Sequence, residues 1–149
     1  MPHVLRGLAC VTLLAVAVSS CSSTETPTSP TDTTSTTATA AAPAFAEDFN
    51  GTVDSSNASF YSFTVTQYGT VNITLTNVSG TFVPSSLQLG LGLGTPSGTD
   101  CSTTVTITTR SGSTPQLTGS YQPGVYCVRV FDVGNLFGTA NFAVTISYP

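Results

Sequence analysis

The chain has 149 residues, which is enough for one ordinary domain with tails. Only 7% of the residues are charged, there is no lysine, and three arginines face seven acids, for a formal net charge of -4. A surface this poor in cations cannot neutralise phosphates, so we exclude nucleic acid as a partner, and also charge-driven binding to anionic headgroups.

The first 20 residues have the order of parts of an export signal. Arg6 is their only positive side chain, an apolar run extends from Leu8 to Val18, and two small residues follow, Ser19 and Ser20. The run is shorter than the ~20 apolar residues that a transmembrane helix needs. We therefore predict a signal peptide over residues 1–20 and export of the rest of the chain.

The end of this segment, Val18-Ser-Ser-Cys21, resembles a bacterial lipobox. The resemblance implies that Cys21 is thioether-linked to a diacylglycerol and becomes the new amino terminus, with two or three acyl chains (palmitate or similar) as a permanent membrane anchor. Ser22 stands where an aspartate would retain enteric lipoproteins at the inner membrane, which implies delivery to the outer membrane or cell surface. The alternative is an ordinary secretory signal that ends on a chance cysteine.

Residues 21–46, after cleavage, would comprise the lipidated cysteine and a linker rich in Ser, Thr, Pro and Ala. The linker has no apolar periodicity and cannot bury enough surface to offset the entropy of ordering it. We predict a disordered, extended spacer between lipid and domain. Glycosylation of its hydroxyl groups stays open.

Residues 47–149 alternate apolar and polar side chains with a period of two, and no segment has a convincing period of 3.6. Short strands separated by turn signals indicate an antiparallel sandwich or barrel, and about 100 residues suffice for a two-sheet core. We predict an all-β domain, a single antiparallel β-sandwich. The predicted strands cover residues 58–66, 71–76, 86–94, 103–109, 121–130 and 139–148.

The strand at 121–130 organises this prediction. It follows a Gln-Pro-Gly turn, and its apolar residues alternate with a cysteine and an arginine, so that one face is apolar and the other mixed. We predict a central strand whose mixed face carries a disulfide-bonded cysteine. The apolar residues are Tyr126, Val128 and Val130, and those of the mixed face are Cys127 and Arg129.

Cys101 and Cys127 are the two cysteines of the predicted domain. In an exported protein an even pair of cysteines predicts a disulfide. A loop of ~27 residues would stabilise the fold by roughly 3–4 kcal/mol in the chain-entropy model. The alternative, a metal ligand or nucleophilic thiol, lacks partners because the one histidine, His3, lies in the signal segment.

Gly90 and Gly92 alternate with the leucines of the strand at 86–94 and leave a bare strip on its outward face. Glycine weakens a strand unless a backbone or ring approaches closely. Three interpretations follow: a tail, loop or aromatic ring covers the strip, a shallow groove there takes a ligand, or the strand has a bulge.

The domain resembles the bacterial pre-peptidase C-terminal domain, which is often appended to secreted peptidases. The family is a small β-sandwich of jelly-roll type, so the resemblance implies that architecture here. Its pattern is matched in order by Phe49-Asn-Gly-Thr-Val53, Tyr61-Ser-Phe-Thr-Val65, Gly69-Thr-Val-Asn-Ile-Thr-Leu75, Leu87-Gln-Leu89, Pro123-Gly-Val-Tyr-Cys-Val-Arg-Val130 and Phe142-Ala-Val-Thr-Ile146.

The resemblance also implies one weak candidate for a metal. Related collagen-binding domains of clostridial collagenases bind Ca²⁺ through an acidic amino-terminal segment, and Glu47, Asp48 and Asp54 occupy the equivalent region here. Carboxylate oxygens are suitable Ca²⁺ ligands. The alternative is a solvated acidic strand edge. We predict no other cofactor.

We predict no enzymatic activity, because the chain after the signal has no histidine or lysine to serve as a base. Asp100 and Asp132 are the one carboxylate pair considered for glycoside hydrolysis, but nothing in the sequence places them together, and both lie near turns.

A domain displayed on a stalk suits a binding module for a polysaccharide or protein of the cell envelope. No tryptophan is available to stack on sugars, and Tyr68, Tyr121, Phe131 and Phe137 are the rings considered. The alternative is a structural or assembly component that takes no ligand and pairs through its edge strands. The sequence assigns no ligand-binding residue and no oligomeric state.

Overall fold

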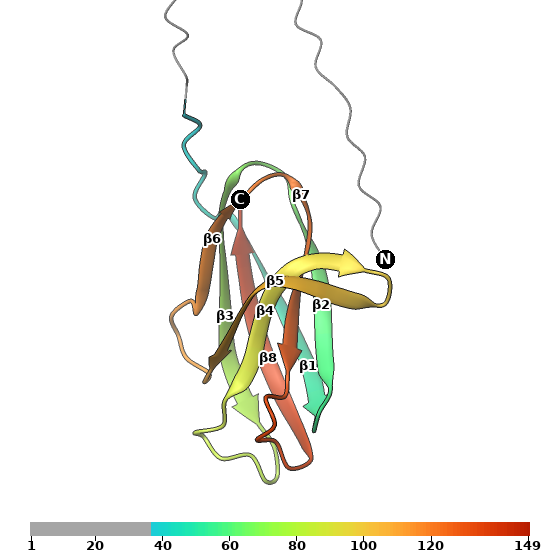
Figure 1. Cartoon of the computed structure of the whole chain (residues 1–149). Helices are drawn as coiled ribbons and strands as arrows, with labels where there is room; N and C mark the ends of the chain where they lie inside the picture. The colour runs from blue at the N-terminus through green and yellow to red at the C-terminus, as the bar shows by residue number, and fades with distance from the viewer. Residues whose placement is uncertain (1–36) are drawn as a thin grey trace, which may run out of the picture. The chain divides into compact units, whose positions relative to one another are not determined.

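A computed structural model describes residues 37–149 and shows eight strands in this part of the chain (Figure 1). No helix of the described residues is long and apolar enough to cross a membrane. The strands are β1 (Phe45–Asp54), β2 (Ala58–Val65), β3 (Gly69–Ser79), β4 (Leu89–Ser97), β5 (Asp100–Thr109), β6 (Leu117–Tyr121), β7 (Gly124–Phe131) and β8 (Thr139–Tyr148).

The strands form two four-stranded antiparallel sheets, which we call sheet A (order β1-β8-β3-β6) and sheet B (order β2-β7-β4-β5). Neighbours within a sheet are mostly distant in sequence, so the chain crosses repeatedly between the sheets, as in a jelly roll. The predicted all-β sandwich of jelly-roll type is confirmed. In this order β1 and β2 are edge strands, as are β6 and β5.

The core fills the space between the sheets, because alternate side chains of every strand point inward. β4 contributes Leu89, Leu91 and Leu93, all with at most 2% of their surface exposed, and they face a core completed by strands of sheet A. Ile73 and Ile146, cross-strand partners on β3 and β8, have no exposed surface. The alternation read from the sequence is therefore the burial pattern of the sandwich.

β7 confirms the prediction of a central strand. It lies between β2 and β4 and buries Val128 and Val130 completely, while Cys127 and Arg129 are on the outer face. β1 and β6 were not among the predicted strands. β6 is only five residues long, and β1 places the acid Glu47 on its inward face, where a period-two pattern requires an apolar residue.

The ordered structure begins before the predicted start at Glu47. β1 begins at Phe45, the Ala44 N–H donates to the Tyr148 carbonyl at 2.9 Å, and Ala41 forms a parallel bridge with Gly69. The prediction of a disordered linker up to residue 46 is thus wrong at its carboxyl end, because pairing with β8 and β3 orders this segment. The predicted signal peptide, Cys21 and the linker up to residue 36 lie outside the described residues.

A candidate binding hollow on the outer face of sheet B

The end of the β4–β5 hairpin curves across β7, as Figure 1 shows. The register of the two strands shifts between Leu93 and Gly94, which marks a β-bulge. A Cβ on Gly94 would lie 1.9 Å from the Ser102 carbonyl oxygen, so only glycine allows the two backbones to approach this closely. The bend carries residues 101–103 over the outer face of the sheet.

The glycine strip is covered, which decides between the three interpretations. The Phe131 ring lies over Gly90, where a Cβ would be 2.2 Å from it, and Thr103 covers Gly92. Gly94 takes part in the bulge. An aromatic ring and the bent strand thus cover the strip, and the glycines themselves are not the candidate site.

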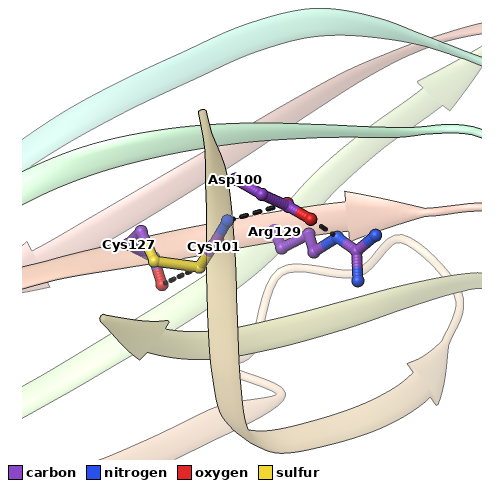
Figure 2. Close-up of polar contacts among 4 residues, drawn as sticks. All are labelled: Asp100, Cys101, Cys127 and Arg129. Carbon is purple, nitrogen blue, oxygen red and sulfur yellow. Dashed lines mark hydrogen bonds and ion pairs between the residues drawn. A yellow bond between two sulfur atoms is a disulfide. The ribbon is translucent and has the colours of Figure 1, made fainter. Parts of the chain in front are cut away.

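A disulfide between Cys101 and Cys127 fixes the bent hairpin to β7 (Figure 2). Their Cα atoms are 5.9 Å apart, and both residues are buried. This confirms the predicted disulfide on the second face of β7. Because β5 is not a ladder neighbour of β7, the bridge joins strands that no backbone hydrogen bonds connect.

Next to the disulfide, Arg129 of β7 and Asp100 of β5 point toward one another (Figure 2). The Arg129 guanidinium also lies 5.4 Å from the centre of the Phe131 ring. Arg129 Nε and Asp100 Oδ1 are 3.6 Å apart, which is an ion pair too long for a hydrogen bond. The Nε atom is shielded from solvent and has no hydrogen-bond partner. Figure 2 shows the two Nη groups directed away from Asp100.

These side chains border a hollow of about 430 Å³ on the outer face of sheet B. The turn after β1, the outer face of β2, the bent hairpin and the end of β7 each contribute to its wall or floor. This volume lies in the ~300–1,000 Å³ range of small-ligand sites. The lining residues are Ser56, Asn57, Ala58, Phe60, Thr99, Asp100, Arg129, Phe131 and Asp132.

Asp132 holds together the rim of the hollow. Its Oδ2 accepts a hydrogen bond from the Ser56 N–H at 2.8 Å, and its Oδ1 accepts from the N–H groups of residues 134–136 at 2.9–3.2 Å. Burial alone would raise the pKa of Asp132, but these four backbone donors together hold its pKa below the usual range. The carboxylate is therefore a structural anion that ties the β1–β2 turn to the loop after β7.

The structure brings Asp100 and Asp132 to the same hollow, although nothing in the sequence places them together. Glycoside hydrolysis needs one carboxyl group with a raised pKa to act as general acid. The lowered pKa of Asp132 makes it unsuitable for that role, and Asp100 is paired with Arg129. The arrangement offers donors, acceptors and aromatic surface, which is the chemistry of binding.

Of the four rings considered from the sequence, only Phe131 lines the hollow. Tyr121 packs edge-on against Tyr126 at 5.2 Å, Phe137 is a loop residue 85% exposed, and Tyr68 is half-buried between β2 and β3. Phe60, which also lines the hollow, was not among the rings considered from the sequence; it is 36% exposed and is the cross-strand neighbour of Arg129. The signal available in the sequence was its position in β2. Phe60 is out of phase with the inward Tyr61 and Phe63, which places its ring on the outer face.

The three acidic residues considered for calcium are not clustered. No group of three or more His, Cys, Asp or Glu residues that could hold a metal ion occurs within residues 37–149. Asp48 accepts a hydrogen bond from the Thr145 hydroxyl at 2.7 Å, and Asp54 accepts one from Thr139 at the far end of β1. Adjacent strand positions direct Glu47 and Asp48 to opposite faces.

Glu47 instead joins the two sheets at the edge formed by β1 and β2. Its carboxylate accepts hydrogen bonds from the phenols of Tyr148 and Tyr61, the latter at 2.7 Å. The bond from Tyr148, and then that from Tyr61, lowers the pKa of Glu47. The hydrogen bond between Tyr148 and Glu47 also raises the pKa of Tyr148 to about 12. This inward carboxylate is therefore satisfied by two hydroxyl donors, one from each sheet.

Comparison with known protein families matches residues 57–132 to the bacterial pre-peptidase C-terminal domain. The match takes in the strands from β2 to β7 and every residue lining the hollow except Ser56. β1 and β8 lie outside it, so the match is shorter than the resemblance drawn from the sequence, which also used residues 47–53 and 142–146. A comparison with curated protein sequences finds no match.

Proposed function

Because the chain belongs to the bacterial pre-peptidase C-terminal domain family, a family of non-catalytic β-sandwich modules, we propose that it is a binding module. In this proposal the module is exported, anchored by lipid on Cys21, and binds a polysaccharide or protein at the cell envelope. The candidate binding surface is the hollow on the outer face of sheet B.

The observation that carries the proposal is the composition of this hollow. It combines two aromatic rings, one arginine with unused donors and a largely exposed carboxylate in a volume suited to a small ligand or one residue of a polymer. The bulge, the disulfide and the bonds of Asp132 fix its walls. A rigid site costs less conformational entropy on binding than a mobile one.

The binding test uses residues 37–149, a compact unit that contains the whole core and both cysteines of the disulfide. The fragment, made in an oxidising compartment, is mixed with insoluble cellulose, chitin and peptidoglycan and with immobilised envelope proteins. We expect retention on at least one of them, and reduced retention of Arg129→Ala. Equal retention of both proteins would show that the hollow is not the binding surface.

The anchor is tested separately on the exported full chain. We expect mass spectrometry to find a diacylglycerol on Cys21 at the mature amino terminus. The apolar run and the lipobox-like sequence before this cysteine support the expectation. An unmodified terminus at Ser22 or later would remove the anchor from the proposal.

A structural or assembly role is the second candidate, and β5 is the observation that favours it. β5 is an edge strand of sheet B, residues 102–109 carry no charge, and Val105 is 43% exposed. Long uncharged edges pair readily with other strands. Sedimentation of the fragment at two concentrations distinguishes the candidates: self-association without retention on any probe favours assembly, and a monomer that binds favours the binding module.

A further inference from the structure

We propose that the hollow binds a neutral sugar ring, which stacks on Phe60 while its hydroxyl groups are bound by Arg129 and Asp100. This inference rests on the proposed binding function and names its ligand class. It predicts a glycan made of uncharged hexose units as the partner, with one unit seated over β2 and β7 below the bent hairpin.

Phe60 supplies the stacking surface. Phe60 lies on the outer face of an edge strand, is 36% exposed and borders the hollow directly. Phe131 is differently engaged, because its ring covers Gly90 and carries the Arg129 guanidinium. The face of an aromatic ring is electronegative and attracts the C–H groups on the apolar side of a sugar.

Arg129 and Asp100 supply the polar contacts. A guanidinium is a planar fork of donors. The Nη groups of Arg129 point away from Asp100, and its Nε has no hydrogen-bond partner in the described part of the chain. Asp100 Oδ1 accepts from the Cys101 N–H at 2.7 Å and faces Arg129, while its side chain is 62% exposed. Neighbouring hydroxyls of one sugar can accept from the arginine and donate to the carboxylate, so both kinds of group are used.

The charges favour a neutral over an acidic glycan. Arg129 is the one cation that lines the hollow, and two carboxylates, Asp100 and Asp132, line it as well. Within residues 37–149 the two arginines are outnumbered by the five acids Glu47, Asp48, Asp54, Asp100 and Asp132. An anionic polymer would enter a region of net negative potential, and Arg129 is already partly neutralised by its ion pair.

The experiment is an NMR titration of ¹⁵N-labelled residues 37–149 with neutral hexasaccharides of glucose, mannose and N-acetylglucosamine, and with hexagalacturonic acid as the acidic counterpart. We expect at least one neutral probe to shift the amide signals of residues 56–60, 99–100 and 129–132. We expect Phe60→Ala to weaken that binding about tenfold or more, since it removes the half-buried platform. Arg129→Lys, which keeps the charge but loses the planar fork, should weaken it by a similar factor.

Phe137→Ala is the matched control, because its ring is 85% exposed and does not line the hollow. Thermal unfolding of each variant verifies folding, and Arg129→Lys tests the site independently if Phe60→Ala does not fold. The inference is overturned if no neutral probe shifts these residues, if Phe60→Ala and Arg129→Lys bind like the unaltered fragment, or if only hexagalacturonic acid binds there. Binding of the acid at the hollow, or Arg129-dependent retention by an envelope protein in the retention test, would leave the binding function standing. No binding in either experiment would remove both.

Discussion

The outer faces of the two sheets differ although the sheets have the same number of strands and the same core. The outer face of sheet A carries small, hydroxyl, amide and acidic side chains in the described residues, such as Thr118 and Ser120 of β6 and Asn50 and Thr52 of β1. That of sheet B carries two phenylalanines, an arginine, the disulfide and three glycines. A sheet face needs only small polar side chains, like those of sheet A, to be solvated by water.

The second face also contains features that weaken a sheet. Glycines within β4 lower strand stability, and a bulge interrupts the ladder between β4 and β5. The disulfide offsets this by fixing the displaced hairpin. A bulge also interrupts the β3–β8 ladder of sheet A, so the two sheets differ in what their outer faces carry. The disulfide and the exposed Phe60 are on that of sheet B. Four predictions test that contrast, beginning with the largest expected effect.

The double variant Cys101→Ala/Cys127→Ala should lose about 3 kcal/mol of unfolding free energy, since the bridge closes a loop with a sequence separation of 26. For a domain of this size the melting temperature should fall by roughly 10–20 °C. Calorimetry measures the loss. A melting temperature within a few degrees of the unaltered protein would mean that the hairpin keeps its place without the bridge.

Gly94→Ala should destabilise the fold by about 2 kcal/mol or more, because its Cβ would meet the Ser102 backbone, which cannot move aside as a side chain can. Gly124→Ala is the matched control in the same sheet, since its Cβ would meet its nearest neighbour at an ordinary 3.5 Å. Urea unfolding should show less than about 1 kcal/mol for the control. Equal losses at the two positions would argue against the close approach at the bulge.

Glu47→Gln should cost about 1 kcal/mol at neutral pH, since the carboxylate is partly exposed and a charged acceptor is replaced by a neutral one. The pKa of Glu47 lies below its ordinary 4.5, so its bonds stabilise the fold above that pH and are lost as the pH falls through the lowered pKa. The pKa of Tyr148, raised to about 12, makes the same bond fail as the pH rises through that value. Urea unfolding is measured at a series of pH values from 3 to 12. The unfolding free energy of the variant should therefore depend less on pH at both ends of this range. A variant whose stability follows the unaltered protein at every pH would exclude this role.

Thr118→Lys, on the outer face of sheet A, should change the unfolding free energy by less than about 0.5 kcal/mol, as expected for an exposed position without special contacts. It should also leave binding at the hollow unchanged. Chemical unfolding and the titrations above measure both. A large effect would show that the face of sheet A is less tolerant than its composition indicates.

The sequence predicted the sandwich because its core obeys local alternation, as Tyr126, Val128 and Val130 show on β7. It predicted the disulfide from the cysteine count and the expected export. It could not predict the hollow, because that depends on the fold of the hairpin back over β7 at Gly94, which the sequence displays only as a strip of glycines. β1 was missed for a similar reason, because the inward Glu47 depends on distant partners. Its carboxylate accepts hydrogen bonds from Tyr61 and Tyr148, which are 14 and 101 residues away in the sequence.

The pairing of β1 with β8 has a mechanical consequence. The chain enters the sandwich at Phe45, opposite Tyr148, and β1 ends at Asp54, next to the turn that lines the hollow. Tension between the amino-terminal side of the chain and an object held in the hollow would run along the axis of β1. It would load all ten register pairs of this ladder together, in shear, instead of peeling them apart one by one.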